Sequence, residues 1–223
     1  MRVVFDLDGT LVDSSADLLA AINCVLRAHH LPESGRSENL RHAGLGVEAM
    51  FRATIEERAP TWREDEKRAM LDAMGELYNK DPVTLTRPFD GIGEMLGALA
   101  RKGIELCVIS NKPSPLSRRI LTTLFPSISF KEVFGPDSGY PPKPDPASLF
   151  RCRQGLAEGN LLIYVGDTEI DHQTAHGTAD CVYLASWGYR GRDALLSMGF
   201  DERIIVDKPM DLVPILYAKG GMT

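Results

Sequence analysis

The chain has 223 residues, of which 43% are hydrophobic and 25% charged, and these ordinary values for a globular protein exclude a disordered chain. The net charge of -6 argues against a nucleic-acid-binding surface, which needs clustered Lys and Arg. No apolar run approaches the ~20 residues of a membrane span, and the N-terminus lacks a signal-peptide pattern. We therefore expect a cytoplasmic protein with no membrane partner.

The alternation of short β-branched runs with helical periodicity is typical of a parallel sheet covered by helices on both faces. We predict strands at residues 2–5, 104–110, 130–134, 161–166, 181–185 and 203–206. We predict helices at residues 91–102, 115–124, 146–157 and 210–217. The expected fold class is α/β, with a doubly wound, mostly parallel sheet.

One stretch, residues 14–87, breaks this alternation. It contains no convincing strand, but helical spacing recurs at residues 16–28, 47–58 and 65–78. The chain re-enters the sheet pattern at residues 86–91, TRPFDG, where Pro and Gly predict a turn. We therefore predict a helical domain at 15–86, inserted into an α/β core made of 1–14 and 87–223.

The strongest motif is FDLDGTLVDS at residues 5–14, where the first predicted strand ends. Side chains two apart in an extended backbone share a side, so Asp6 and Asp8 can address one ligand together. Gly9 permits a backbone turn. Adjacent carboxylates repel each other unless a cation or proton lies between them, which suggests a divalent metal. For a bare Asp-x-Asp-Gly pattern, the alternative is an acidic turn that ends a strand.

The full string resembles the first motif of the haloacid dehalogenase superfamily, and specifically of its phosphatases. The resemblance implies a Rossmann-like α/β core with an inserted helical cap, and Asp6 as the nucleophile that forms an aspartyl-phosphate. It also implies that Asp8 protonates the leaving alcohol and later deprotonates the attacking water. The dehalogenase branch lacks an acid at the second position, so Asp8 favours phosphoryl transfer over carbon-halogen cleavage.

Two further motifs follow in the order that the superfamily has them. Ser110, in SNK at the end of a predicted strand, resembles the hydroxyl that binds the transferring phosphoryl group, and the backbone N–H of Asn111 is a second candidate donor. Lys143, in YPPKPDP, resembles the lysine that pairs with the nucleophile and the phosphate. The flanking prolines stiffen its loop and reduce the cost of aiming the ammonium group.

The last motif is VGDTEID at residues 165–171. Asp167 is expected to coordinate the metal, and Asp171 to ligate it or hold its waters; both roles are expected to depend on a turn at Gly166. The alternative for Asp167 is an N-cap of the following helix. The expected metal set is Asp6, Asp8, Asp167 and Asp171, and its oxygen ligands suit Mg²⁺. In the family the next helix usually ends in Ala-Gly, but here Ala179 stands where the glycine is typical.

The inserted helices occupy the place of a cap that closes over the cleft and excludes water. The string LRHAGLGV at residues 40–47 resembles a Gly-rich segment of phosphoglycolate phosphatases. Arg41 and Gly44 are therefore candidate substrate-binding residues, with Arg41 clamping a substrate carboxylate; a solvated cation at a helix end is the equal alternative for Arg41.

We expect a magnesium-dependent, phosphoglycolate-phosphatase-like hydrolase of a small phosphorylated metabolite. A sugar phosphomutase of the same superfamily is the nearest alternative, because it uses the same aspartyl-phosphate. A non-catalytic phosphometabolite-binding protein is the alternative from another class, since fold does not fix function. Either a monomer or a homodimer is compatible with the sequence.

Overall fold

A computed structural model describes residues 1–221 of the chain. The chain divides into two compact units, one formed by Met1–Asp13 with Pro88–Thr223 and the other by Ser14–Arg87. We call them the core unit and the helical unit. Two short strands, β2 (Val12–Asp13) and β3 (Arg87–Pro88), pair where the chain leaves the core unit and returns to it.

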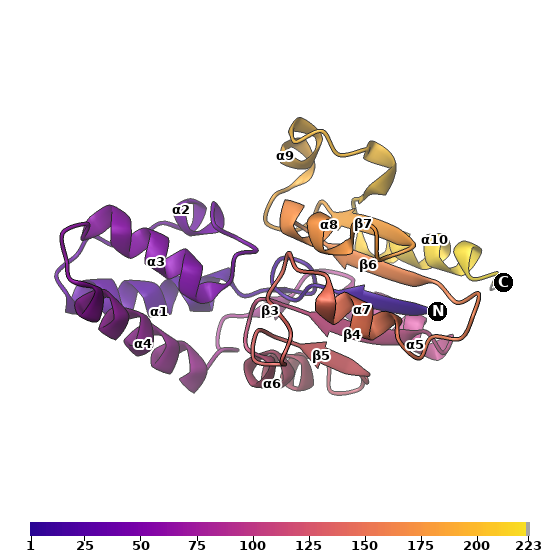
Figure 1. Cartoon of the computed structure of the whole chain (residues 1–223), viewed down its shortest axis with the longest axis horizontal. Coiled ribbons are helices and arrows are strands. Elements are labelled where there is room, and N and C mark those ends of the chain that lie inside the picture. Colours follow the sequence, from indigo (N-terminus) through magenta and orange to yellow (C-terminus); the bar gives the residue numbers. More distant parts are fainter. Residues whose placement is uncertain (222–223) are drawn as a thin grey trace. The chain divides into compact units, whose positions relative to one another are not determined.

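The core unit contains a six-stranded sheet in which all neighbouring strands are parallel. In spatial order the strands are β5 (Glu132–Phe134), β4 (Glu105–Ile109), β1 (Arg2–Phe5), β6 (Leu162–Gly166), β7 (Cys181–Ala185) and β8 (Ile205–Val206). The first strand therefore lies inside the sheet (Figure 1). Its residue Phe5 is paired with Val108 on one side and with Val165 on the other. The strand order reverses beside β1, which is where open α/β sheets bind ligands.

Helices cover both faces of this sheet, because its central strands are apolar and buried on both sides. The helices of the core unit are α5 (Ile92–Arg101), α6 (Ser114–Leu124), α7 (Ala147–Arg153), α8 (Glu169–Ala175), α9 (Arg192–Ser197) and α10 (Leu212–Lys219), with 3-10 turns η1 (Glu202–Ile204) and η2 (Pro209–Asp211). Side chains of α7 and α8 join those of β1 and β6 in one apolar cluster. Helices α5 and α10 pack together on the opposite face (Figure 1). The predicted α/β, doubly wound, mostly parallel fold is confirmed.

Several element boundaries differ from the predictions, and local chemistry explains the differences. Helix α7 ends at Arg153 rather than at residue 157, because Gly155 adopts a left-handed φ of 76°. Helix α8 ends at Ala175 and is followed by Gly177 at φ 74°, so its terminating glycine lies two residues before Ala179. Helix α9 was not predicted; only Leu195 of its six residues is buried, so its sequence carries almost no periodic signal.

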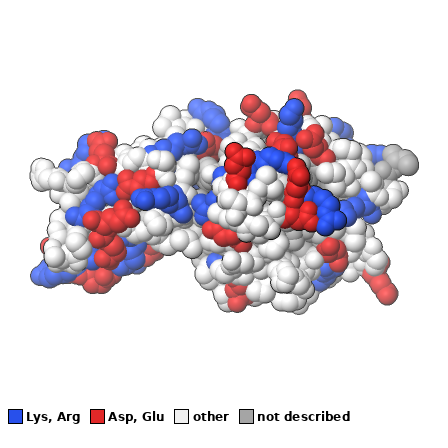
Figure 2. Space-filling model, turned by 90° about the horizontal axis from the view of Figure 1, so that it is seen from above, with Lys and Arg blue, Asp and Glu red and all other residues white. Residues whose placement is uncertain are grey.

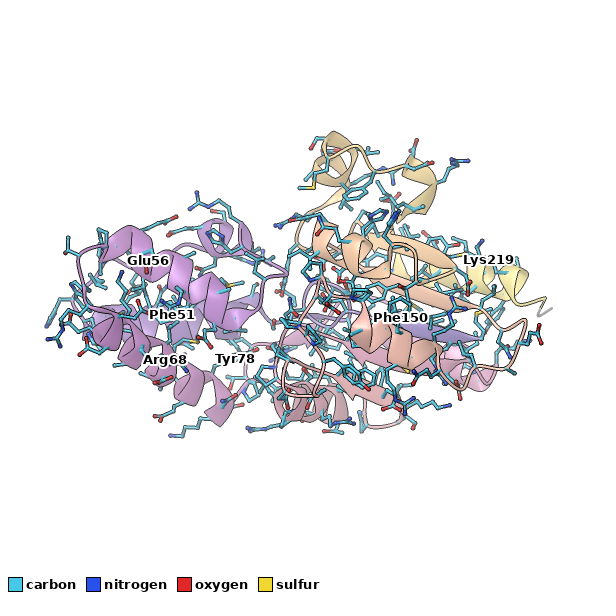
Figure 3. The ribbon with its side chains drawn as sticks, in the orientation of Figure 1. Phe51, Glu56, Arg68, Tyr78, Phe150 and Lys219 are labelled. Atoms are coloured by element: carbon cyan, nitrogen blue, oxygen red, sulfur yellow. The ribbon has the colours of Figure 1, made fainter. Side chains whose placement is uncertain are left out.

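The helical unit consists of α1 (Ser15–Ala28), α2 (Arg36–Leu40), α3 (Val47–Arg58) and α4 (Glu64–Lys80). Helix α4 packs against α1 and α3, and Phe51 and Tyr78 are buried inside the unit (Figure 3). Helix α2, which is only five residues long, was not predicted. No helix in residues 1–221 is long and apolar enough to cross a membrane.

The two ends of the helical unit are joined through Asp17 on α1. Its buried carboxylate accepts hydrogen bonds from the backbone N–H groups of Leu85 and Thr86, at 3.0 and 2.7 Å, and from the Thr86 hydroxyl at 2.7 Å. Since these donors precede the return to the core unit, Asp17 fixes the end of the inserted segment beside its beginning.

We predict that Asp17→Ala lowers the free energy of unfolding by roughly 3 kcal/mol, because it leaves buried donors without their charged acceptor. Urea denaturation followed by circular dichroism measures the change. The matched control is Asp72→Ala on α4, whose exposed carboxylate pairs with Arg68 at 3.0 Å. This substitution should lower the free energy of unfolding by about 0.5 kcal/mol or less. Equal losses in the two variants would contradict the role of Asp17.

Candidate active site

Three of the predicted site residues are each the first residue after a parallel strand. Asp6 follows β1, Ser110 follows β4 and Asp167 follows β6. The strands are in register, and the Asp6 N–H donates to the carbonyl of Val165 at 2.9 Å. The carboxyl ends of adjacent parallel strands share one edge of the sheet, so these residues, far apart in sequence, lie at one site.

Lys143 is the cation that lies beside Asp6. Its buried Nζ lies 2.7 Å from Asp6 Oδ1 and 2.7 Å from Asp171 Oδ1. Burial opposes the charge of the ammonium group, but the carboxylates of Asp171 and Asp6 outweigh it and hold the pKa of Lys143 well above its usual value. The side chain of Asn111 fixes the backbone of Lys143, because Oδ1 accepts from its N–H at 2.8 Å and Nδ2 donates to its carbonyl at 3.1 Å. The SNK and KPDP motifs are thus joined in space.

Asp171 receives hydrogen bonds at both carboxylate oxygens. Oδ1 accepts from Lys143 and from the Tyr164 hydroxyl at 3.1 Å. Oδ2 accepts from the Thr168 hydroxyl at 2.7 Å and from the backbone N–H groups of Thr168 and Asp167 at 3.0 and 3.2 Å. Burial would raise the pKa of Asp171, but Lys143 and the Thr168 donors lower it. The contact that this carboxylate makes with Lys143 fixes the ammonium group beside Asp6.

Asp167 is fully buried and receives one donor at each oxygen. The Tyr189 N–H donates to Oδ2 at 2.8 Å, and the Thr10 hydroxyl donates to Oδ1 at 3.2 Å. Burial, together with the charges of Asp171 and Asp6, raises the pKa of Asp167 well above its usual value. The N-cap of α8 is Thr168, so the alternative interpretation of Asp167 as the N-cap is wrong. The contact with Tyr189 was not predicted, since nothing in the motif points to the loop after β7.

Two glycines make room for these carboxylates. Gly9 has a φ of 90°, as the predicted turn requires, and a Cβ there would lie 2.4 Å from Asp167 Oδ2. Gly166 lies within β6, not in a left-handed turn, and a Cβ there would lie 2.2 Å from Cγ of Asp171. The prediction that Gly166 forms a turn is therefore wrong. The site needs a glycine here because a larger residue would not let Asp171 approach.

Asp8 pairs with a lysine that the sequence analysis did not single out. Its Oδ1 lies 2.6 Å from Nζ of Lys112, whose side chain is 1% exposed. The backbone N–H of Lys112 donates to the Ser110 hydroxyl at 3.2 Å. The only sequence signal was the place of Lys112 in the SNK string, two residues beyond a strand end. The structure therefore adds a second buried lysine to the site.

The donor set fits a divalent cation. Asp6, Asp167 and Asp171 each offer an oxygen, and these oxygens lie within 4.8 Å of one another. Burial raises the pKa of Asp6 to about 7 although Lys143 opposes the rise, and Asp171 and Asp8 add to it. Three grouped carboxylates face one ammonium group, so a hard cation with oxygen ligands would offset the negative charge that they carry when ionised. Asp8 is not in this group of three.

The charged groups of the cluster are hidden from the surface, since Asp6, Lys143, Asp167 and Asp171 are all buried. On the face shown in Figure 2, basic and acidic side chains are interspersed over both units. The electrostatics of the site are therefore set by these local groups rather than by the net charge of -6.

The two candidate residues in the inserted segment belong to the helical unit. Arg41 is the C-cap residue that follows α2, its side chain is 62% exposed, and its Nη2 lies 3.9 Å from Glu57 Oε1. Gly44 has a left-handed φ of 91°, which suits the turn before α3. Their contact with a substrate stays a prediction.

Known proteins match almost the whole chain. The family described as haloacid dehalogenase-like hydrolase matches residues 3–181. The phosphoglycolate phosphatase of Aquifex aeolicus is 31% identical over 218 residues, 97% of either chain. That of Cereibacter sphaeroides is 34% identical over 188 residues, which cover 84% of this chain and 86% of the relative.

Solved structures agree with these relatives. A crystal structure of a predicted phosphoglycolate phosphatase from Haemophilus somnus 129pt has a TM-score of 0.83 at 29% identity, covering 96% of this chain and 97% of the other. The resemblance to phosphoglycolate-phosphatase-like proteins, drawn from the motifs, is thereby confirmed. By its site, fold and relatives, the chain belongs to the haloacid dehalogenase-like hydrolase family.

Proposed function

We propose that the protein is a magnesium-dependent phosphatase that hydrolyses a small, phosphoglycolate-like monoester through an aspartyl-phosphate on Asp6. One observation carries this proposal: the Asp6 carboxylate is buried at the end of the central strand, 2.7 Å from Lys143 and grouped with Asp167. A carboxylate nucleophile needs its charge offset while an anionic phosphate approaches, and this arrangement provides that.

The reaction proceeds in two steps. In the first, an Asp6 oxygen forms a bond to phosphorus, the bond from phosphorus to the ester oxygen breaks, and Asp8 gives its proton to the leaving alcohol. In the second, Asp8 takes a proton from water, the water oxygen bonds to phosphorus, and the bond from phosphorus to Asp6 breaks. Inorganic phosphate leaves and Asp8 is again protonated. The Ser110 hydroxyl and the Asn111 N–H are the proposed donors to the phosphoryl oxygens.

We assign the metal to Asp6 and Asp167. Each oxygen of Asp167 accepts from one donor, whereas Asp171 accepts from two donors at Oδ1, one of them the Lys143 ammonium, and from three at Oδ2. Asp8 faces Lys112. When bound, Mg²⁺ screens the repulsion between the nucleophile and the phosphate. Asp171 acts by holding Lys143 beside Asp6. Lys112 stabilises the Asp8 carboxylate that the first step leaves behind.

The helical unit is the proposed cap, which closes over the site, excludes water and selects small substrates. Arg41 and Gly44 are its proposed contacts with the substrate. The phosphoglycolate preference is supported by the names of the relatives from Aquifex aeolicus and Cereibacter sphaeroides. We further propose that the protein acts in the cytoplasm on a free small metabolite.

The substrate proposal predicts that kcat/KM for 2-phosphoglycolate exceeds that for sugar phosphates and pyrophosphate. Phosphate release from each compound, with Mg²⁺ and with EDTA, measures the preference. No preference for 2-phosphoglycolate would overturn the substrate while sparing the reaction class. An isomeric sugar phosphate in place of inorganic phosphate would identify a phosphomutase. A protein that binds these compounds and releases nothing would be a non-catalytic binder.

The nucleophile prediction is that Asp6→Asn lowers kcat by on the order of 10³-fold or more, because an amide cannot form the acyl phosphate. The variant should also lose Mg²⁺-dependent binding of beryllium fluoride, which mimics the phosphoryl group on an aspartate. Both are measured on protein whose circular dichroism spectrum matches the wild type. Retained turnover would rule out Asp6 as the nucleophile.

Lys112→Met should lower kcat by roughly 10-fold or more, because Asp8, the proposed acid and base, loses its ionic partner. Proton transfer by such a group typically accelerates a reaction by about 10² to 10⁴-fold. Steady-state kinetics at saturating Mg²⁺ measure the loss. The matched control is Lys131→Met, which removes a more exposed lysine paired with Glu105 and should leave kcat unchanged. Equal rates in the two variants would argue against a role for Lys112.

A pH dependence follows from the Asp6 pKa of about 7, which burial raises above the ordinary value of 3.8. Between these two values the folded protein binds a proton at Asp6 that the unfolded chain does not, so stability contributed by this group falls as pH rises. Protons compete with the metal for this carboxylate. Mg²⁺ should therefore raise the Tm more at pH 8 than at pH 5.5.

Thermal denaturation with Mg²⁺ and with EDTA at both pH values tests this prediction. Asp6→Asn, which cannot titrate, serves as the control, and its Mg²⁺-induced shifts should be smaller and closer to each other. A wild-type Tm shift that is the same at pH 5.5 and pH 8 would contradict the raised pKa.

A further inference from the structure

We propose that the loop after β7, residues 186–190, is a positioning element that pre-forms Asp167 for metal binding, and that Trp187 is its key residue. We call this segment the β7 loop. The inference rests on the proposed function, since it concerns the proposed metal ligand, and it adds residues outside every motif of the sequence analysis.

The first observation is the pair of donors that fix the Asp167 carboxylate. One comes from the β7 loop, where the Tyr189 N–H donates to Oδ2 at 2.8 Å. The other comes from the loop after β1, where the Thr10 hydroxyl donates to Oδ1 at 3.2 Å. A carboxylate held at both oxygens by different loops loses its rotational freedom, and second lone pairs remain for a cation.

Trp187 joins these two loops. Its indole Nε1 donates to the Thr10 carbonyl at 2.9 Å, across 177 positions of sequence. The indole therefore holds the backbone of the residue whose hydroxyl contacts Asp167. Losing this hydrogen bond would remove a direct link between Thr10 and the β7 loop, so the two donors to Asp167 would no longer be aligned by a shared contact.

Close packing on two sides restricts the Asp167 side chain. A Cβ on Gly188 would lie 2.3 Å from Asp167 Cβ and 2.4 Å from the carbonyl oxygen of Gly9. A Cβ on Gly9 would lie 2.4 Å from Asp167 Oδ2. The side chain is thus enclosed by two glycines, one from each loop, and any larger residue at either place must displace it.

The β7 loop is itself anchored at both ends. The Ser186 hydroxyl donates to Asp207 at 2.6 Å, and Arg190 pairs with Glu169 of α8 at 2.8 Å. Between these ends the Tyr189 ring packs edge-on against Phe89, with ring centroids 6.5 Å apart. The loop therefore behaves as a fixed support rather than as a mobile connection.

This support has an energetic consequence for metal binding. Asp167 lies among the buried carboxylates of Asp6 and Asp171, and without a cation their mutual repulsion favours turning it away. Donors fixed by the β7 loop oppose that movement before the metal arrives. Ligands that are already in position lower the free-energy cost of metal binding. Losing a group that hydrogen-bonds to a metal ligand typically weakens metal affinity by about 10 to 100-fold.

The test is a titration with Mn²⁺, in which electron paramagnetic resonance measures the free ion and thus binding without any turnover. Trp187→Phe keeps the aromatic ring but lacks the N–H, and we expect its Kd for Mn²⁺ to rise about 10-fold. In the phosphatase assay, the Mg²⁺ concentration that gives half-maximal activity should rise by a similar factor, while kcat at saturating Mg²⁺ stays near the wild-type value. A merely destabilised protein would not show this split.

The matched control is Trp62→Phe, which changes the other tryptophan, a residue of the helical unit that packs against His29. It should bind Mn²⁺ as the wild type does. A second variant, Thr10→Val, keeps the carbonyl that accepts from Trp187 but removes the hydroxyl donor that this contact aligns with Asp167 Oδ1, and it should also weaken Mn²⁺ binding. It keeps the proposal testable should Trp187→Phe fold poorly.

Unchanged Mn²⁺ affinity in Trp187→Phe, or in Thr10→Val if only that variant folds, would overturn the positioning role while leaving the proposed phosphatase intact. A loss of kcat at saturating Mg²⁺ with no change in Mn²⁺ affinity would also overturn it. Failure of the wild-type protein to bind Mn²⁺ would instead remove the metal from the proposed function, and this inference with it.

Discussion

Three carboxylates and one ammonium group are buried together at the carboxyl end of the central strand, and the balance of their charges governs the rest of the site. Lys143 lies 2.7 Å from both Asp6 and Asp171, yet the pKa of Asp6 still stands near 7 because burial outweighs this single cation. The grouped carboxylate oxygens are the donor set that suits a hard divalent ion.

The fold keeps this unfavourable cluster in place through backbone geometry. The register of β1, β4 and β6 fixes the residues that follow each strand, and glycines at 9, 166 and 188 allow the carboxylates to approach closely. Neutral donors then fix the oxygens of two of these carboxylates: Thr168 and Tyr164 donate to Asp171, and Tyr189 and Thr10 donate to Asp167. The packed core therefore holds the carboxylates together despite their mutual repulsion.

The motifs predicted much of this site because they are local in sequence. The spacing of Asp6 and Asp8, the strand end before Ser110 and the proline-flanked Lys143 each identified a residue that the structure places at this edge of the sheet or in contact with it. Contacts between motifs were not predictable in this way. Lys112 had no assigned role until its pairing with Asp8 appeared, and the hydrogen bond of Trp187 to Thr10 spans 177 positions.

The sequence by itself determined the alternation of strands and helices, the helical insertion and the family, because periodicity and motif strings are properties of neighbouring residues. Only the tertiary structure decided what each side chain contacts. It showed that Gly166 makes room for Asp171, that Thr168 caps α8, and that Tyr189 supports Asp167. The physical reason is that strand pairing and loop packing bring together residues far apart in the chain, and no local pattern encodes which atoms then come within hydrogen-bonding distance.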